Sequence, residues 1–115
     1  MIEDRFRFRV WDKEENKYKN GMEVFDYMRG ISNPDRYILE QCSGLKDKIG
    51  KLIYEGDILK PNSNTITKEV VYEDGSYWAK DTIYFHDKCH IFQRWIDECG
   101  YEIVGNIHTE NINDM

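Results

Sequence analysis

The segment Val70-Val71-Tyr72-Glu73-Asp74-Gly75-Ser76-Tyr77-Trp78-Ala79 decides the fold class, because it has the pattern of a β-hairpin. Two runs rich in β-branched and aromatic residues flank an Asp-Gly pair. That pair favours a type I′ turn, in which both central residues adopt positive φ. The turn also predicts the strand register: Glu73 opposite Ser76, Tyr72 opposite Tyr77, and Val71 opposite Trp78.

This hairpin carries large apolar side chains on both of its faces. Successive side chains of a strand alternate between faces, so Tyr72 and Tyr77 share one face and Trp78 lies on the other. A small sheet cannot bury both faces in its own core. We therefore take Tyr72, Tyr77 and Trp78 as a candidate protein interface, since aromatic side chains are typical interface anchors. Packing of both faces by this chain alone is the alternative.

The pattern of the remaining chain is also mainly β. Residues 58–59 begin a strand, and a short helix is expected after Asp87 as its N-cap, with Gly100 ending it. In the helix, Ile91, Phe92, Trp95, Ile96 and Cys99 would form one apolar stripe. Further strands are expected at 5–11, 37–42 and 101–107, the last with a bulge at Gly105.

Residues 5–11 alternate strictly between arginines and apolar residues, which is typical of a strand with one polar face. Arg5, Arg7 and Arg9 would share that polar face. We favour cross-strand ion pairs between these arginines and carboxylates of a neighbouring strand. A binding site for an anion or an acidic partner is the alternative.

Composition and charge restrict the class of partner. The chain of 115 residues has a net charge of −6, and residues 61–115 carry all of that excess, with 4 basic and 10 acidic residues. A non-specific nucleic-acid binder needs the opposite sign of charge, so the charge disfavours nucleic acid as a partner. No segment approaches the roughly 18 apolar residues of a membrane span. The absence of a signal sequence and the odd number of cysteines indicate reduced thiols in a cytoplasm.

Four residues come nearest to a metal site, namely His86, Cys89, His90 and Cys99. Structural zinc sites bring together separated ligand pairs, whereas three of these residues lie within five positions. We therefore predict no metal site and no cofactor. Cys89 and His90 are neighbours in sequence, which does not make their side chains face each other, so we assign no catalytic residue.

Three segments resemble the YopX family, which is found mainly in phages and prophages. They are an opening segment, FRVWDK at 8–13; a central signature, SGLKDK at 43–48 with GK at 50–51 and IYEGDI at 53–58; and a closing segment, IVGNI at 103–107. The resemblance implies a single domain over residues 1–115. An N-terminal β segment of about 1–42 would pack against a small, bent, SH3-like barrel of about 43–110, with at most one short helix. It implies no activity, because the glycines and turn residues of these motifs describe a backbone path.

Three functions from different classes follow as hypotheses. The leading one is a non-enzymatic phage or prophage accessory protein in the cytoplasm of the bacterial host, which acts by protein–protein contact, including contact between copies of itself in a homo-oligomer. The second is a metal-dependent, nuclease-like hydrolase. The third is an acidic decoy that mimics nucleic acid and uses the negative residues 61–115 against a host factor.

Overall fold

The computed structural model describes residues 7–19, 36–62, 66–83 and 87–108, and their architecture is mainly β, as predicted. Within these ranges the chain forms two sheets and one helix. The strands are β1 (Phe8–Asp12), β2 (Lys17–Lys19), β3 (Tyr37–Lys46), β4 (Leu52–Tyr54), β5 (Asp57–Lys60), β6 (Lys68–Glu73), β7 (Ser76–Asp81), β8 (Lys88–His90) and β9 (Glu102–Asn106), and the helix is α2 (Gln93–Cys99).

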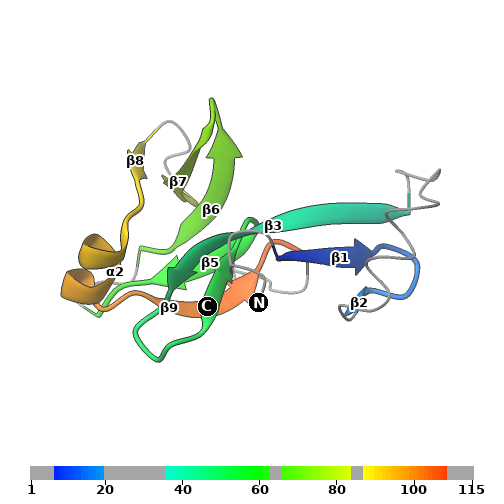
Figure 1. The fold of residues 1–115 in the computed structure, drawn as a ribbon, viewed down its shortest axis with the longest axis horizontal. Helices are drawn as coiled ribbons and strands as arrows, with labels where there is room; N and C mark the ends of the chain where they lie inside the picture. Colours follow the sequence, from blue (N-terminus) through cyan, green and yellow to red (C-terminus); the bar gives the residue numbers. More distant parts are fainter. Residues whose placement is uncertain (1–6, 20–35, 63–65, 84–86, 109–115) are drawn as a thin grey trace.

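The first sheet has the strand order β2-β1-β3-β4 and the second has the order β8-β7-β6-β5-β9. Every pairing between described strands is antiparallel. In Figure 1 the second sheet is strongly curled, and its β6–β7 hairpin rises away from β5 and β9, while β1 and β3 extend to the opposite side of the molecule. β3 is the long strand that starts beside β1 and ends beside β4.

The main core lies inside the curl of the second sheet, where α2 covers it. Alternation along β6 and β7 directs Val70 and Ala79 into this core, and Ile96 of α2 packs against them. Cys99 and Trp95 lie at its edge. The buried members of the core are Ile53, Leu59, Val70, Ala79, Ile91, Ile96 and Tyr101.

The helix is shorter than the sequence predicts. It begins at Gln93 with Phe92 at the N-cap, so the predicted cap at Asp87 is wrong. The intervening residues form β8, because they pair with β7 from Trp78 to Lys80 and that pairing outweighs the local preference for helix. The predicted end is confirmed: Gly100 adopts a left-handed φ of 67° and its N–H donates to the carbonyl of Ile96.

The last strand contains an irregularity close to the predicted bulge. Ile58 of β5 lies opposite Gly105, whereas the next residue, Leu59, lies opposite Ile103. Val104 is therefore the extra residue, one position before Gly105.

The described helix is not long and apolar enough to span a membrane.

Candidate functional site

The predicted hairpin turn is confirmed in detail. Asp74 and Gly75 have φ values of 53° and 78°, as a type I′ turn requires. The register places Glu73 opposite Ser76, Tyr72 opposite Tyr77 and Val71 opposite Trp78. This turn therefore determines which face of the hairpin each aromatic ring occupies.

Trp78 packs against strands of its own sheet. Its indole N–H donates to the carbonyl oxygen of Glu73 at 3.0 Å. The ring of His90, on β8, stacks on the indole with 3.7 Å between centroids, and the ammonium of Lys88 lies 4.5 Å from the indole centroid. The polar end and a large part of the ring of Trp78 thus have partners within the chain.

The two tyrosines on the opposite face differ in exposure. Tyr77 packs against the main core, and its hydroxyl donates to the carbonyl oxygen of Cys42 at 3.3 Å. Tyr72 meets the Tyr77 ring edge-on, with 4.8 Å between centroids, and 47% of its surface is exposed. Of the three predicted interface residues, Tyr72 therefore offers the most accessible ring.

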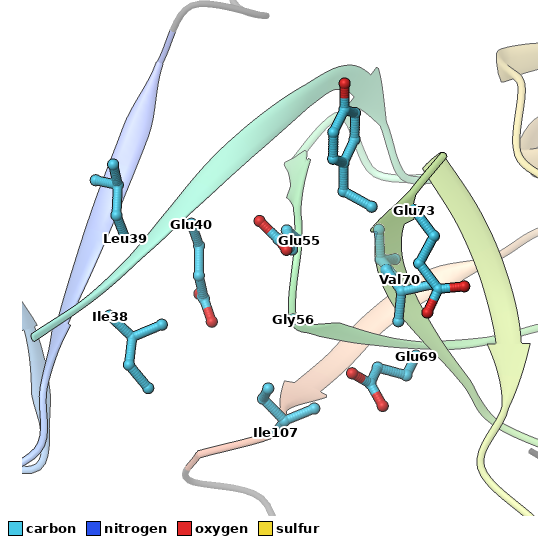
Figure 2. A pocket seen from close by; sticks show the side chains of 11 residues that line it. Ile38, Leu39, Glu40, Glu55, Gly56, Glu69, Val70, Glu73 and Ile107 are labelled. Atoms are coloured by element: carbon cyan, nitrogen blue, oxygen red, sulfur yellow. The ribbon is translucent and has the colours of Figure 1, made fainter. Parts of the chain in front are cut away.

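Tyr72 lines a pocket between β3 and β6 with a volume of about 280 Å³. Figure 2 shows the side chains from β3, from the turn between β4 and β5, and from β6 arranged around this space, with Ile107 at one end. The lining residues are Ile38, Leu39, Glu40, Glu55, Gly56, Glu69, Val70, Val71, Tyr72, Glu73 and Ile107.

The pocket gathers exposed apolar side chains. Within the described part of the chain, six large apolar residues are exposed, and Leu39, Tyr72 and Ile107 are three of them. All three line this pocket, although they come from β3, from β6 and from the residue after β9. Exposed apolar groups that gather at a concave site are typical of binding surfaces, whereas isolated ones are ordinary.

Four glutamates also line the pocket, and two of them are neutralised by neighbours. Glu73 accepts a hydrogen bond from Lys88 at 2.9 Å, which lowers the pKa of the Glu73 carboxyl. Glu40 is buried and accepts hydrogen bonds from Arg9 at 2.7 Å and Tyr18 at 2.9 Å. The same carboxylate lies 2.7 Å from the Nε2 of His108.

The other two, Glu55 and Glu69, form no salt bridge with the residues that the structure describes. The backbone N–H of Gln41 donates to the Glu55 carboxylate, and Lys80 lies opposite Glu69 in the register of β6 and β7. Burial raises the pKa of Glu69, the attraction of Lys80 lowers it, and repulsion from Glu40, Glu73 and Glu55 raises it, with a net rise. Burial likewise raises the pKa of Glu55. The pocket therefore combines an apolar rim with two half-buried carboxylates that form no salt bridge with the described residues.

Glu40 belongs also to a buried ionic cluster between the two sheets, which the sequence did not reveal. The guanidinium of Arg9 contacts Glu40 and, at 2.8 Å, Asp57 of β5. It lies over the ring of Tyr18, 4.3 Å from the centroid. Burial lowers the pKa of Arg9, but the two carboxylates outweigh this effect and raise it overall. For Arg9 the structure agrees with cross-strand ion pairing, the favoured interpretation of the arginine face; Arg5 lies outside the described residues.

Two aspartates in the turns of the family-like motifs have structural roles. Asp47 is buried and accepts backbone N–H groups from Ile49, Lys51 and Ile103, so it joins the β3–β4 turn to β9. Asp12 at the end of β1 accepts both arms of the Arg36 guanidinium, which strongly lowers the pKa of this aspartate. These residues organise the backbone, as the sequence motifs indicated.

The residues considered for zinc lie in different environments. Cys89 and His90 are exposed on β8, and His90 stacks on Trp78, whereas Cys99 is half-buried against the core. His86 lies outside the described residues. Over the ranges that the structure covers, no group of three or more histidine, cysteine, aspartate or glutamate side chains has the geometry to hold a metal ion.

Comparison with known proteins places the chain in a family and shows its similarity to a solved structure. The chain is similar in structure to protein EF1440 from Enterococcus faecalis, with a TM-score of 0.65, 25% sequence identity, and coverage of 89% of this chain and 92% of that one. No curated protein matches the sequence. The family model of the YopX protein matches residues 7–112, which is nearly the whole chain. On that match, the chain belongs to the YopX family.

Proposed function

We propose that this protein is a phage or prophage accessory protein that acts by protein–protein contact rather than by catalysis, in the cytoplasm of the bacterial host. We further propose that residues 1–115 form one domain, with an N-terminal β segment of about 1–42 and an SH3-like part of about 43–110. The contact surface comprises the Tyr72 face of the β6–β7 hairpin and the adjoining pocket.

The observation that carries the proposal is the convergence of Leu39, Tyr72 and Ile107 on one pocket. Each of these side chains keeps 42–47% of its surface exposed, and three different segments contribute them. Leaving such groups in water is unfavourable by about 25 cal/mol for each Å² of apolar surface, and a bound partner would remove that cost. Tyr77, packed beneath Tyr72, supports the exposed ring from the core side.

Trp78 and Tyr72 can be separated experimentally, because they lie on opposite faces of the hairpin. Tyr72→Ser should leave the fold nearly intact and remove the contact. Trp78→Ser should instead lower the free energy of unfolding by about 2 kcal/mol. Truncation of a fully buried aromatic ring costs about 3–5 kcal/mol, and the loss should be smaller here because Trp78 is half-buried. Homo-oligomerisation, predicted from the sequence, is tested first by light scattering at several protein concentrations.

If copies of the chain associate, Tyr72→Ser should reduce the mass and Trp78→Ser should not. If the chain is a monomer, capture from a host lysate should recover a protein with the wild type and with Trp78→Ser, but not with Tyr72→Ser. Binding or mass that is unaffected by Tyr72→Ser would contradict the proposed surface.

A further inference from the structure

We propose that the pocket between β3 and β6 receives a lysine or arginine side chain, presented by an apolar segment of a different protein. This inference rests on the proposed function, and it specifies the chemistry of the partner. Glu55 and Glu69 would contact the cationic end of the inserted side chain. Leu39, Tyr72 and Ile107 would contact its aliphatic stem and the apolar residues on either side.

The charges of the pocket select a cation. Of the four glutamates, Glu40 and Glu73 already have a cationic partner, as described above. Glu55 and Glu69 form no salt bridge with the described residues, although Arg9 and Lys80 respectively attract them from a longer distance. Figure 2 shows their carboxylates directed toward the space between β3 and β6. A guanidinium or ammonium group there would be held by charge-assisted hydrogen bonds, which are about twice as strong as neutral ones.

The apolar rim selects a cation that is carried on a hydrocarbon stem. Lysine and arginine bury a chain of three or four methylene groups along apolar surface while the charged end reaches a polar group. The exposed ring of Tyr72 and the exposed branched chains of Leu39 and Ile107 provide apolar surface in the pocket that the two carboxylates also line. A bare metal ion or a fully hydrophilic cation would leave this rim unused.

The volume of the pocket is sufficient for a single long side chain. At about 280 Å³ the pocket lies at the lower limit of the roughly 300–1,000 Å³ typical of small-molecule sites. The remainder of a partner would lie outside, against the rim. A second copy of this chain is a poorer candidate, because each copy has a net charge of −6 and would approach an acidic surface against electrostatic repulsion.

The test is a selection of binders from a random octapeptide library, carried out with the full chain at low salt. Peptides that bind should share one arginine or lysine with apolar neighbours. The double variant E55Q/E69Q should bind these peptides about tenfold more weakly than the wild type does. This tenfold loss of affinity corresponds to about 1.4 kcal/mol of binding free energy. The matched control is E98Q, which removes one exposed glutamate charge from α2, outside the pocket.

A selected peptide should bind less tightly as salt increases, because salt screens partly exposed charge pairs. Exchanging the cationic residue of the peptide for glutamine should reduce the affinity as much as E55Q/E69Q does. The exchanged peptide should bind E55Q/E69Q only slightly more weakly than it binds the wild type. Spermidine, as a free polyamine, should not compete at concentrations that leave the ionic strength unchanged. Failure to enrich cationic peptides, equal binding to E55Q/E69Q, or effective competition by spermidine would each overturn the inference.

The result separates this inference from the proposed function. Enrichment of purely apolar peptides that bind the wild type and E55Q/E69Q equally, yet fail to bind Tyr72→Ser, would retain the hairpin as a docking surface and reject the cationic partner. Self-association that E55Q/E69Q abolishes would identify a second copy as the occupant, and would likewise overturn the inference of a different protein.

Discussion

Glu40 lies between two groups of acidic side chains that differ in their ion pairing. On one side is the ionic cluster, in which Glu40 and Asp57 share the guanidinium of Arg9. On the other side is the pocket, in which Glu55 and Glu69 form no salt bridge with the described residues and burial raises the pKa of both. The residue types are the same, and the elements that supply them are adjacent.

The difference lies in whether each carboxylate is in direct contact with a cationic side chain of the chain itself. A buried charge is costly unless it is paired and hydrogen-bonded, so the complete cluster serves the fold. The half-buried carboxylates of the pocket are retained at a cost to stability. Sites that break the usual rules of stability in this way are often functional. The contrast leads to three predictions, ordered from the largest expected effect to the smallest.

Arg9→Met should cause the largest effect, because it leaves Glu40 and Asp57 buried without their counter-charge. Removing one partner from a buried ionic group typically costs about 3–5 kcal/mol in the free energy of unfolding. Arg94→Met is the matched control: Arg94 is exposed and pairs with Glu98 on α2, so its loss should cost less than about 0.5 kcal/mol. Urea denaturation measures both values. Equal losses would show that the cluster is not shielded from water.

Gly56→Ala should have the second largest effect, because Gly56 joins the two groups. Gly56 has a φ of 92°, and an added Cβ would lie only 2.6 Å from the Oε2 of Glu40. Gly50→Ala is the control, since Gly50 has a similar φ of 88° but open space at its Cβ position.

Backbone strain alone should cost about 1–2 kcal/mol at Gly50. At Gly56 we expect about 1–3 kcal/mol more, because Glu40 must also move away from its partners. The difference between the two variants, taken from urea denaturation curves, measures how rigidly the cluster holds Glu40. Two equal losses would mean that Glu40 moves freely.

Glu69→Gln should have the smallest effect and the opposite sign. Because burial raises the folded-state pKa of Glu69 above its unfolded value, the ionised carboxylate destabilises the fold at neutral pH. That penalty disappears as the pH falls through the folded-state pKa. Glu69→Gln should therefore stabilise the chain by a few tenths of a kcal/mol at pH 7 and by less at pH 5, where the wild type is already partly protonated.

Glu73→Gln is the contrasting variant at the same pocket. The pKa of Glu73 is lowered by Lys88, so its contribution is favourable above the unfolded pKa and is lost as the pH falls through the folded pKa. This variant should destabilise the chain at neutral pH. Thermal melting at the two pH values tests both signs, and stabilisation by both variants would indicate general relief of negative charge instead of a specific role for Glu69.

Local patterns predicted the features that local physics controls. The Asp74-Gly75 turn follows from the few residues that tolerate positive φ, and the register follows from the turn. Gly100 at the end of α2 is predictable for the same reason. The start of that helix was predicted wrongly, because the pairing of β8 with β7 depends on residues about ten positions apart.

The candidate site could be predicted only in part. Tyr72, Tyr77 and Trp78 were identified from alternation, but alternation does not tell which face the chain itself covers. His90 and Lys88 cover Trp78, whereas Tyr72 stays exposed. The strict alternation of residues 5–11 indicated paired arginines. It gave no signal for the far partners of Arg9, which lie 31 positions away at Glu40 and on β5 at Asp57.

The sequence by itself determined the mainly β class, the hairpin and its register, and the turn roles of the family motifs, because these depend on the conformational preferences of a few adjacent residues. Only the tertiary structure decided which carboxylates are neutralised and which line a pocket. Glu40, Glu55 and Glu69 look alike in sequence, and the partners that distinguish them come from β1, β2 and the residues after β9. Burial and counter-charge are properties of the folded arrangement, and no local pattern encodes them.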